Sequence, residues 1–235
     1  MSLSADLGCL LKPDAAELAE HYPSCAEMIA DGAVHAIGLV LGMAGGAALY
    51  AVALTYDKPS IAGAVGLYTG CTILMLACSA VYNLTRPSQA RRLLRRLDEG
   101  AIFMMIAGSC TPLAIGLLPD VWQALQIGAV WAVALLGAAG KVFRPKWSDH
   151  AWTQLYMAFT ALAVLPLAPL AFERLPPVSL GMLGLAVAVY ALGTRIYLNH
   201  KARYRRAIWH MMVIAGAAAH CGALATGVVL PAVSV

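Results

Sequence analysis

The sequence predicts an all-α membrane protein: a bundle of seven transmembrane helices with a cytoplasmic N-terminus and an external C-terminus. Composition, the spacing of apolar runs and the distribution of basic residues each support this prediction. Hydrophobic residues make up 61% of the 235 residues and charged residues only 12%, against roughly 25% charged in soluble domains. The mean hydropathy is +0.74. So much apolar side chain requires lipid as the solvent, which excludes a soluble enzyme, a disordered regulator and a secreted disulfide scaffold.

Seven apolar runs are long enough to span a bilayer, and each is bounded by charged residues or by proline. Leu118-Pro119-Asp120 separates the third run from the fourth. Pro166 and Pro169 lie within the fifth run and predict a kink there. We expect spans near residues 32–54, 61–83, 97–118, 121–140, 151–172, 178–198 and 207–230.

The first span carries a glycine at every fourth position, at Gly38, Gly42 and Gly46. This GxxxG spacing places the three glycines on one helix face. Small residues on one face allow the backbones of neighbouring membrane helices to approach closely. The pattern therefore predicts close packing of the first span against another helix.

The basic residues are distributed unequally between the two sides of the predicted bundle. With seven spans, fourteen of the sixteen Lys and Arg fall on the side of the N-terminal tail, and only Lys58 and Arg174 fall on the other. Cytoplasmic loops are enriched in Lys and Arg, so the N-terminus is expected in the cytoplasm. The predicted regions are a cytoplasmic tail (1–31), a transmembrane domain (32–230) and an external tail (231–235). Residues 14–30 either lie on the membrane surface or form a solvated tail.

Polar residues of four spans gather at the predicted cytoplasmic end, and polar residues within spans are costly. Some share a helix face because they are four residues apart, as Ser79 and Asn83 are. The cluster is either a functional site or a set of ordinary interfacial residues at helix ends. Its members are Glu27, Asp31, His35, Ser79, Asn83, Asp98, Glu99, Arg206 and His210.

His220 differs from this cluster because it lies well inside the membrane. It follows His210 by ten residues, about 15 Å along a helix, so the two imidazoles cannot share one metal ion. A hydrogen-bonded structural histidine and an intramembrane functional site are both open interpretations.

Four motifs carry a family resemblance, and they run in order from the first span to the seventh. They are EMIADGAVHAIG (27–38), SAVYN (79–83), RRLDEGAIFMMIAGSCTP (95–112) and AIWHMMVIAGAAAH (207–220). With these motifs the sequence resembles the hemolysin III branch of the progestin and adipoQ receptor (PAQR) family. The resemblance implies a zinc ion near the cytoplasmic face, held by one His of the second span and two of the seventh. It also implies hydrolysis of lipid amides by a metal-activated water.

This sequence departs from the implied zinc site at two of its three histidine positions. Ser79 and Asp98 match the family's Ser and Asp and are candidate catalytic residues, whereas Asn83 and Arg206 replace two histidines. His210 remains as the third. Because Asn is a poor zinc ligand and a guanidinium is none, no cofactor is expected here, although the family implies zinc. The alternative is a rebuilt metal site of His210, Asp98 and Glu99, with Glu27 or His35.

The positive charge of Arg206 suggests how a carboxylate in the cluster could be compensated without zinc. Either its guanidinium pairs with Asp98, so that the metal site has become a structural polar cluster, or it reaches lipid phosphates together with Arg203 and Arg205. A carboxylate near the membrane boundary requires such compensation.

These observations favour a hemolysin III/PAQR-type membrane protein that is non-enzymatic or receptor-like and acts in membrane lipid homeostasis. The alternatives are a metal-dependent lipid-amide hydrolase with a non-standard metal site, and a cytolysin or pore. The expected partners are membrane lipids, not nucleic acid, because the net charge of +4 lies in loops. The Ala-, Gly-, Leu- and Arg-rich composition and the short loops favour a bacterial inner (plasma) membrane.

Overall fold

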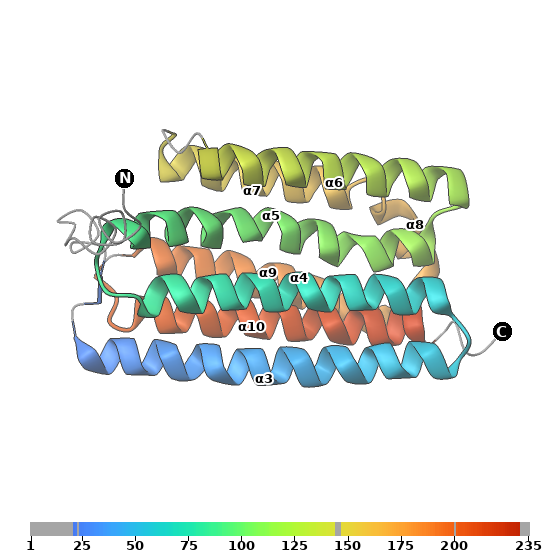
Figure 1. The fold of residues 1–235 in the computed structure, drawn as a ribbon. Coiled ribbons are helices and arrows are strands. Elements are labelled where there is room, and N and C mark those ends of the chain that lie inside the picture. Colours follow the sequence, from blue (N-terminus) through green and yellow to red (C-terminus); the bar gives the residue numbers. More distant parts are fainter. Residues whose placement is uncertain (1–20, 23, 144–146, 200, 231–235) are drawn as a thin grey trace, which may run out of the picture.

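A computed structural model describes residues 21–22, 24–143, 147–199 and 201–230. Within these ranges the chain forms helices and no strand, which confirms the all-α class (Figure 1). The helices are α3 (Cys25–Thr55), α4 (Pro59–Leu84), α5 (Gln89–Leu117), α6 (Asp120–Phe143), α7 (Asp149–Val164), α8 (Ala168–Arg174), α9 (Pro177–Leu198) and α10 (Arg205–Leu224), followed by a π-helical turn (Ala225–Val229).

Six of the helices in the described part are long and apolar enough to cross a membrane, and α7 with α8 makes a seventh if the bent pair is one span. The bend between Ala151–Val164 and Ala168–Arg174 is 51°. Pro166 lies in this break, and α8 has a proline at its start, where the missing N–H is not needed. The kink predicted in the fifth span is therefore confirmed.

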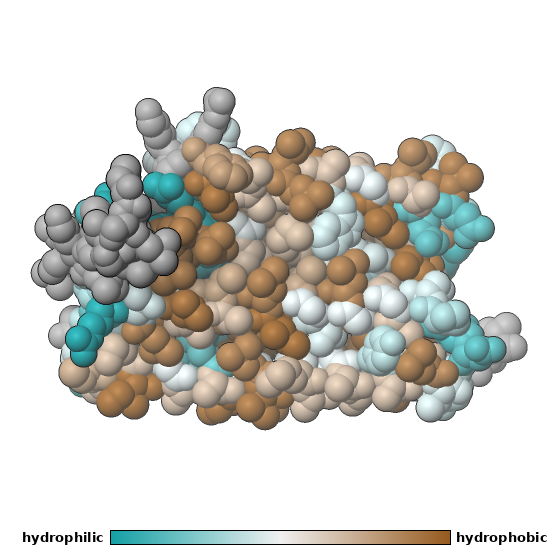
Figure 2. All heavy atoms as spheres, viewed as in Figure 1, coloured by the Kyte–Doolittle hydropathy of each residue, from teal (hydrophilic) through white to brown (hydrophobic). Residues whose placement is uncertain are grey.

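The helices form one bundle whose members run along a common direction (Figure 1). Helix α3 packs between α4 and α10, α5 lies against α4 and α6, and α9 covers α10. The beginning of α3 and the end of α10 lie at opposite ends of the bundle. On the face seen in Figure 2, apolar residues cover the middle of the bundle and hydrophilic residues gather towards its two ends, as a lipid environment requires.

Two helices extend beyond their predicted limits and take in basic residues that we expected in loops. Ser88 caps α5 by accepting a hydrogen bond from the Arg91 N–H at 3.4 Å, so that this helix begins well before residue 97. Arg91 is fully buried. Its Nε donates to the Tyr82 carbonyl oxygen at 3.3 Å, and its guanidinium carbon lies 4.3 Å from the centroid of the Tyr82 ring.

Lys141 is a second basic residue inside a helix, in α6. It is only 5% exposed, it pairs with Glu99 of α5, and its ammonium lies 4.7 Å from the centroid of the Trp152 ring. The ion pair joins α6 to α5, and the contact with Trp152 joins α6 to α7. A buried charge is tolerated when it is paired. Helices α5 and α6 therefore extend beyond the limits that hydropathy alone predicts.

Helix α3 also begins early, at Cys25, because the Ser24 hydroxyl accepts a hydrogen bond from the Glu27 N–H at 3.3 Å. Residues 25–31, which we assigned to the tail, are therefore the first turns of a long helix. Of residues 14–30, which we expected either on the membrane surface or in a solvated tail, 14–20 and 23 are outside the described part of the chain.

The glycines of α3 permit the close packing that their spacing predicted, at two of three positions. A Cβ atom on Gly38 would lie 2.4 Å from Cδ1 of Ile214 in α10, and one on Gly46 would lie 2.4 Å from Oγ1 of Thr69 in α4. At Gly42 the nearest side-chain atom would be 3.9 Å away, which is an ordinary contact.

We expect Gly46→Ala to destabilise the bundle by about 1–3 kcal/mol, because the added methyl group overlaps Thr69. Gly45→Ala is the matched control, since a Cβ there has no atom within 4 Å, and a helical alanine is favourable by about 1 kcal/mol. Thermal unfolding in detergent measures both changes. Equal melting temperatures for the two variants would contradict the assigned packing.

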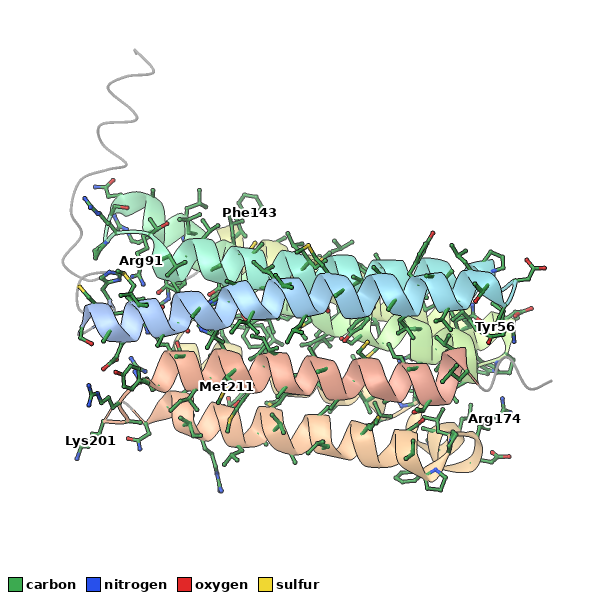
Figure 3. The ribbon with its side chains drawn as sticks, turned by 90° about the horizontal axis from the view of Figure 1, so that it is seen from below. Tyr56, Arg91, Phe143, Arg174, Lys201 and Met211 are labelled. Atoms are coloured by element: carbon green, nitrogen blue, oxygen red, sulfur yellow. The ribbon has the colours of Figure 1, made fainter. Side chains whose placement is uncertain are left out.

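Most of the basic residues lie at one end of the bundle, and this leads to a prediction of orientation. Arg91 and Lys201 lie towards one end, whereas Tyr56 and Arg174 lie towards the opposite end (Figure 3). We expect a cytoplasmic reporter fused at Lys12 to be active and one fused after Val235 to be inactive. An active reporter at both ends would show that the number of crossings is even.

Candidate functional site: a polar network between three helices

Seven polar side chains meet at the end of the bundle where α3 begins, α4 ends and α10 begins. We call them the polar network. All but Tyr22, which precedes α3, are at least nine-tenths buried. They are Tyr22, Asp31, His35, Ser79, Asn83, Arg206 and His210.

Helix geometry explains why these residues face one another. Each helix contributes a pair four residues apart, and such pairs share one face. The close approach of α3 to α10 at Gly38, one turn beyond His35, brings the α3 pair into reach of His210. The packing glycines thus position the site.

The first half of the network runs from α10 to α4. Nη1 of Arg206 donates to Oδ1 of Asn83 at 3.1 Å. The Asn83 amide then donates from Nδ2 to the Ser79 hydroxyl at 3.3 Å and to the Ser79 carbonyl oxygen at 3.0 Å. The oxygen of the Asn83 amide therefore faces Arg206, and its nitrogen faces Ser79.

The second half runs from α4 through α10 to α3. Nδ1 of His210 lies 2.6 Å from Oδ1 of Asp31, and Nε2 of His210 lies 3.3 Å from Oγ of Ser79. Since a carboxylate only accepts hydrogen bonds, Nδ1 carries a proton and donates it to Asp31. In the neutral imidazole Nε2 then accepts from the Ser79 hydroxyl.

Tyr22 closes the network from outside the helices. Its hydroxyl donates to Oδ2 of Asp31, and the guanidinium carbon of Arg206 lies 5.2 Å from the centroid of its ring. Burial, and then the negative charge of Asp31, raise the pKa of Tyr22 above its usual range, so the phenol stays protonated and donates. Sequence reasoning missed this residue, because a single aromatic residue in a polar segment has no periodicity that links it to the helices.

His35 lies beside His210, with ring centroids 4.3 Å apart. Its Nδ1 lies 2.9 Å from the backbone oxygen of Asp31, so Nδ1 donates and Nε2 is left with a lone pair. In the described part of the chain, this buried Nε2 has no hydrogen-bond partner.

Of the other predicted site residues, Asp98 is adjacent to the network and Glu99 is not. Asp98 interacts electrostatically with His210 and with the Ser79 hydroxyl. Glu99 points to another face of α5, where it binds Lys141 and accepts from Nε of Arg95 at 2.9 Å, because successive residues of a helix are about 100° apart. A rebuilt site that uses Asp98 and Glu99 together is therefore not formed.

Two further expectations concern Arg206 and Glu27. Pairing with Asp98 was one of two alternatives for Arg206: among the described residues no such ion pair occurs, and Nη1 of the guanidinium donates to Asn83. In the same part of the chain Glu27 is bound through its backbone N–H to Ser24, without a side-chain contact to the network. Distant from the network, Nε2 of His220 donates to the Ser109 carbonyl oxygen at 3.1 Å.

The residues at the family's zinc positions do not fit the ion. Asn83 and Arg206 are bonded to each other, the guanidinium has no lone pair, and both nitrogens of His210 have hydrogen-bond partners. A different group is closer to what zinc requires, because the potential ligand atoms of Asp31, His35 and His210 lie within 4.8 Å of one another.

Comparison with known proteins identifies the family of the chain. The family model "Haemolysin-III related" matches residues 26–221. The chain is 27% identical over 193 residues to "Hemolysin-3 homolog" of Bacillus subtilis (strain 168), with 82% of this chain and 90% of that protein covered. It is 29% identical over 198 residues to "Hemolysin-3" of Bacillus cereus, with 82% and 87% covered. With its apolar helices and bacterial relatives, the chain belongs to the hemolysin III family and is an integral protein of the bacterial plasma membrane.

Proposed function

We propose that this protein acts in membrane lipid homeostasis as a receptor-like member of its family, without the zinc-dependent hydrolysis that the family resemblance implies. The hydrogen bond between Arg206 and Asn83 carries the proposal. It joins two positions where a zinc site would need ligands, and it places a permanent positive charge where the cation would lie.

The charges of the network support the same proposal. Arg206 is positive and Asp31 is negative, and Asn83, Ser79 and His210 connect them through hydrogen bonds. Both charged side chains are buried, so each depends on the hydrogen bonds of the network. A divalent cation beside the guanidinium would add repulsion that the network does not offset.

A genetic experiment tests this role. Cells lacking the gene are expected to show altered lipid packing, measured with a polarity-sensitive membrane dye. The wild-type chain should restore the packing equally well in zinc-replete and zinc-depleted medium. Unchanged packing in the deletion strain, or restoration only when zinc is supplied, would contradict the proposal.

One observation favours a second candidate, a metal-dependent lipid-amide hydrolase with a non-standard site. Asp31, His35 and His210 supply a carboxylate and two imidazoles, which together with a bound water is a ligand set that catalytic zinc uses. The free lone pair on Nε2 of His35 is available to such an ion. In this case the native protein should contain bound zinc and the His35→Ala variant should not. The zinc-free proposal expects no zinc in either protein.

A further inference from the structure

Three side chains of the polar network lie in the order carboxylate, imidazole and hydroxyl. Oδ1 of Asp31 is 2.6 Å from Nδ1 of His210, and Nε2 of the same ring is 3.3 Å from Oγ of Ser79. A nucleophilic serine needs this sequence of contacts, with a base on the hydroxyl and a carboxylate on the far nitrogen of the base. We propose that Ser79 is a metal-independent nucleophile that accepts acyl groups from carboxylic esters dissolved in the membrane.

The three helices give each side chain one role. Asp31 is a positioning residue: its carboxylate holds the proton of His210 on Nδ1, which leaves the lone pair of Nε2 directed at Ser79. His210 is the base. Ser79 is the nucleophile, and its Oγ lies 3.3 Å from the nitrogen that would take its proton.

Asn83 and Arg206 supply the electrostatic part of the site. Nδ2 of Asn83 lies 3.3 Å from Oγ of Ser79. Negative charge develops on the substrate's carbonyl oxygen when Oγ attacks the carbonyl carbon, so an amide beside Oγ would be close to that oxygen. The amide is fixed in this orientation because its oxygen accepts from Arg206. The two substitutions that remove zinc ligands thus provide a donor and a fixed positive charge.

The reaction is balanced without a metal ion or an oxidant. Oγ of Ser79 forms a bond to the ester carbonyl carbon while its proton moves to Nε2 of His210. The bond from that carbon to the alcohol oxygen then breaks, and the alcohol leaves with the proton from His210. Water, deprotonated by the same imidazole, attacks the acyl-serine and releases a carboxylic acid and free Ser79.

The position of the site favours an ester of a membrane lipid as the substrate. The network lies near the end of the bundle where α3 and α10 begin and α4 ends. Ester carbonyls of bilayer lipids lie at the boundary of headgroups and acyl chains, which helix ends reach. Ser79 is 3% exposed, so a substrate must displace neighbouring side chains. Tyr22 is the network member that precedes the helices, and its hydroxyl donates to Asp31.

A covalent probe tests the nucleophile directly. The full-length protein in detergent is treated with a small alkyl fluorophosphonate in the presence of EDTA, and the modified peptide is identified by mass spectrometry. We expect one adduct on Ser79, formed as Oγ bonds to phosphorus and fluoride leaves. Ser79→Ala should lose the adduct, and Ser109→Ala should keep it, because the Ser109 hydroxyl donates to the Met105 carbonyl oxygen and not to an imidazole.

The rates separate the roles within the site. His210→Gln should slow labelling by about 100-fold, the usual contribution of a general base. Asp31→Asn should lower the maximal labelling rate without changing the half-saturating probe concentration, because it acts through His210. Absence of an adduct on folded wild-type protein, or equal rates in wild type and His210→Gln, would overturn the proposal.

The inference requires the zinc-free network of the proposed function, and the two can fail separately. An adduct on Ser79 that forms equally with and without EDTA supports the nucleophile. Zinc content is measured on the same sample. Unlabelled zinc-free protein would overturn the nucleophile alone, whereas labelling that EDTA abolishes would overturn both proposals.

Discussion

The double variant Asn83→His, Arg206→His should bind about one zinc ion per chain and gain thermal stability from it. Positions 83 and 206 already meet, since Nη1 of Arg206 lies 3.1 Å from Oδ1 of Asn83. His210 is one turn beyond position 206. The substitutions replace a poor ligand and a cation by two neutral imidazoles, so three nitrogen ligands converge on one place. With zinc at 100 times its Kd, binding stabilises the folded bundle by about 2.7 kcal/mol.

Three controls show whether the ion occupies the intended site. Each single variant should bind zinc poorly, because Arg206 repels the ion in one and only two histidines are available in the other. Adding His35→Ala to the double variant should leave its zinc content unchanged. A folded double variant without zinc, or loss of its zinc on His35→Ala, would contradict the assigned positions of these side chains.

Arg206→Gln and Asp31→Asn should each destabilise the protein strongly, whereas the double variant should lose less than the sum. Removing one member of a compensated buried pair leaves the other charge without compensation and typically destabilises by about 3–5 kcal/mol. The two residues are connected through Asn83, Ser79 and His210, so the penalty arises only once when both charges are removed.

Thermal unfolding in detergent gives the three differences that this comparison needs. Arg203→Gln is the matched control: Arg203 is exposed and lies over the Tyr204 ring, so its loss should change stability little. Strictly additive losses for Arg206 and Asp31 would show that the network does not couple them.

The sequence predicts the helices and part of the site because both depend on short-range patterns. Apolar runs define the spans, and Pro166 marks the bend between α7 and α8. Spacing of four residues places Ser79 with Asn83, and Arg206 with His210. These short-range patterns predict which residues share a helix face. They do not predict which faces contact each other in the bundle.

Partners that lie on other helices were not predictable in the same way. Whether Asp31 or Asp98 would bind His210 depends on the distance between α3 and α10, which Gly38 sets through its contact with Ile214. Likewise, Arg91 and Lys141 are buried in helices although hydropathy predicts them in loops. A hydropathy value includes the charge of a residue but not the group that pairs with it. Tyr22 reaches Asp31 from outside any periodic segment.

The zinc content of the purified native protein tests the central claim most directly. The protein is isolated without added chelator, dialysed, and analysed for metal per chain, and its melting temperature is recorded with and without EDTA. Because Arg206 and Asn83 are hydrogen-bonded to each other at two of the zinc positions, we expect well under one zinc per chain. EDTA should then leave the melting temperature unchanged. One zinc per chain, removed by EDTA with a fall in melting temperature, would contradict the account and favour the site of Asp31, His35 and His210.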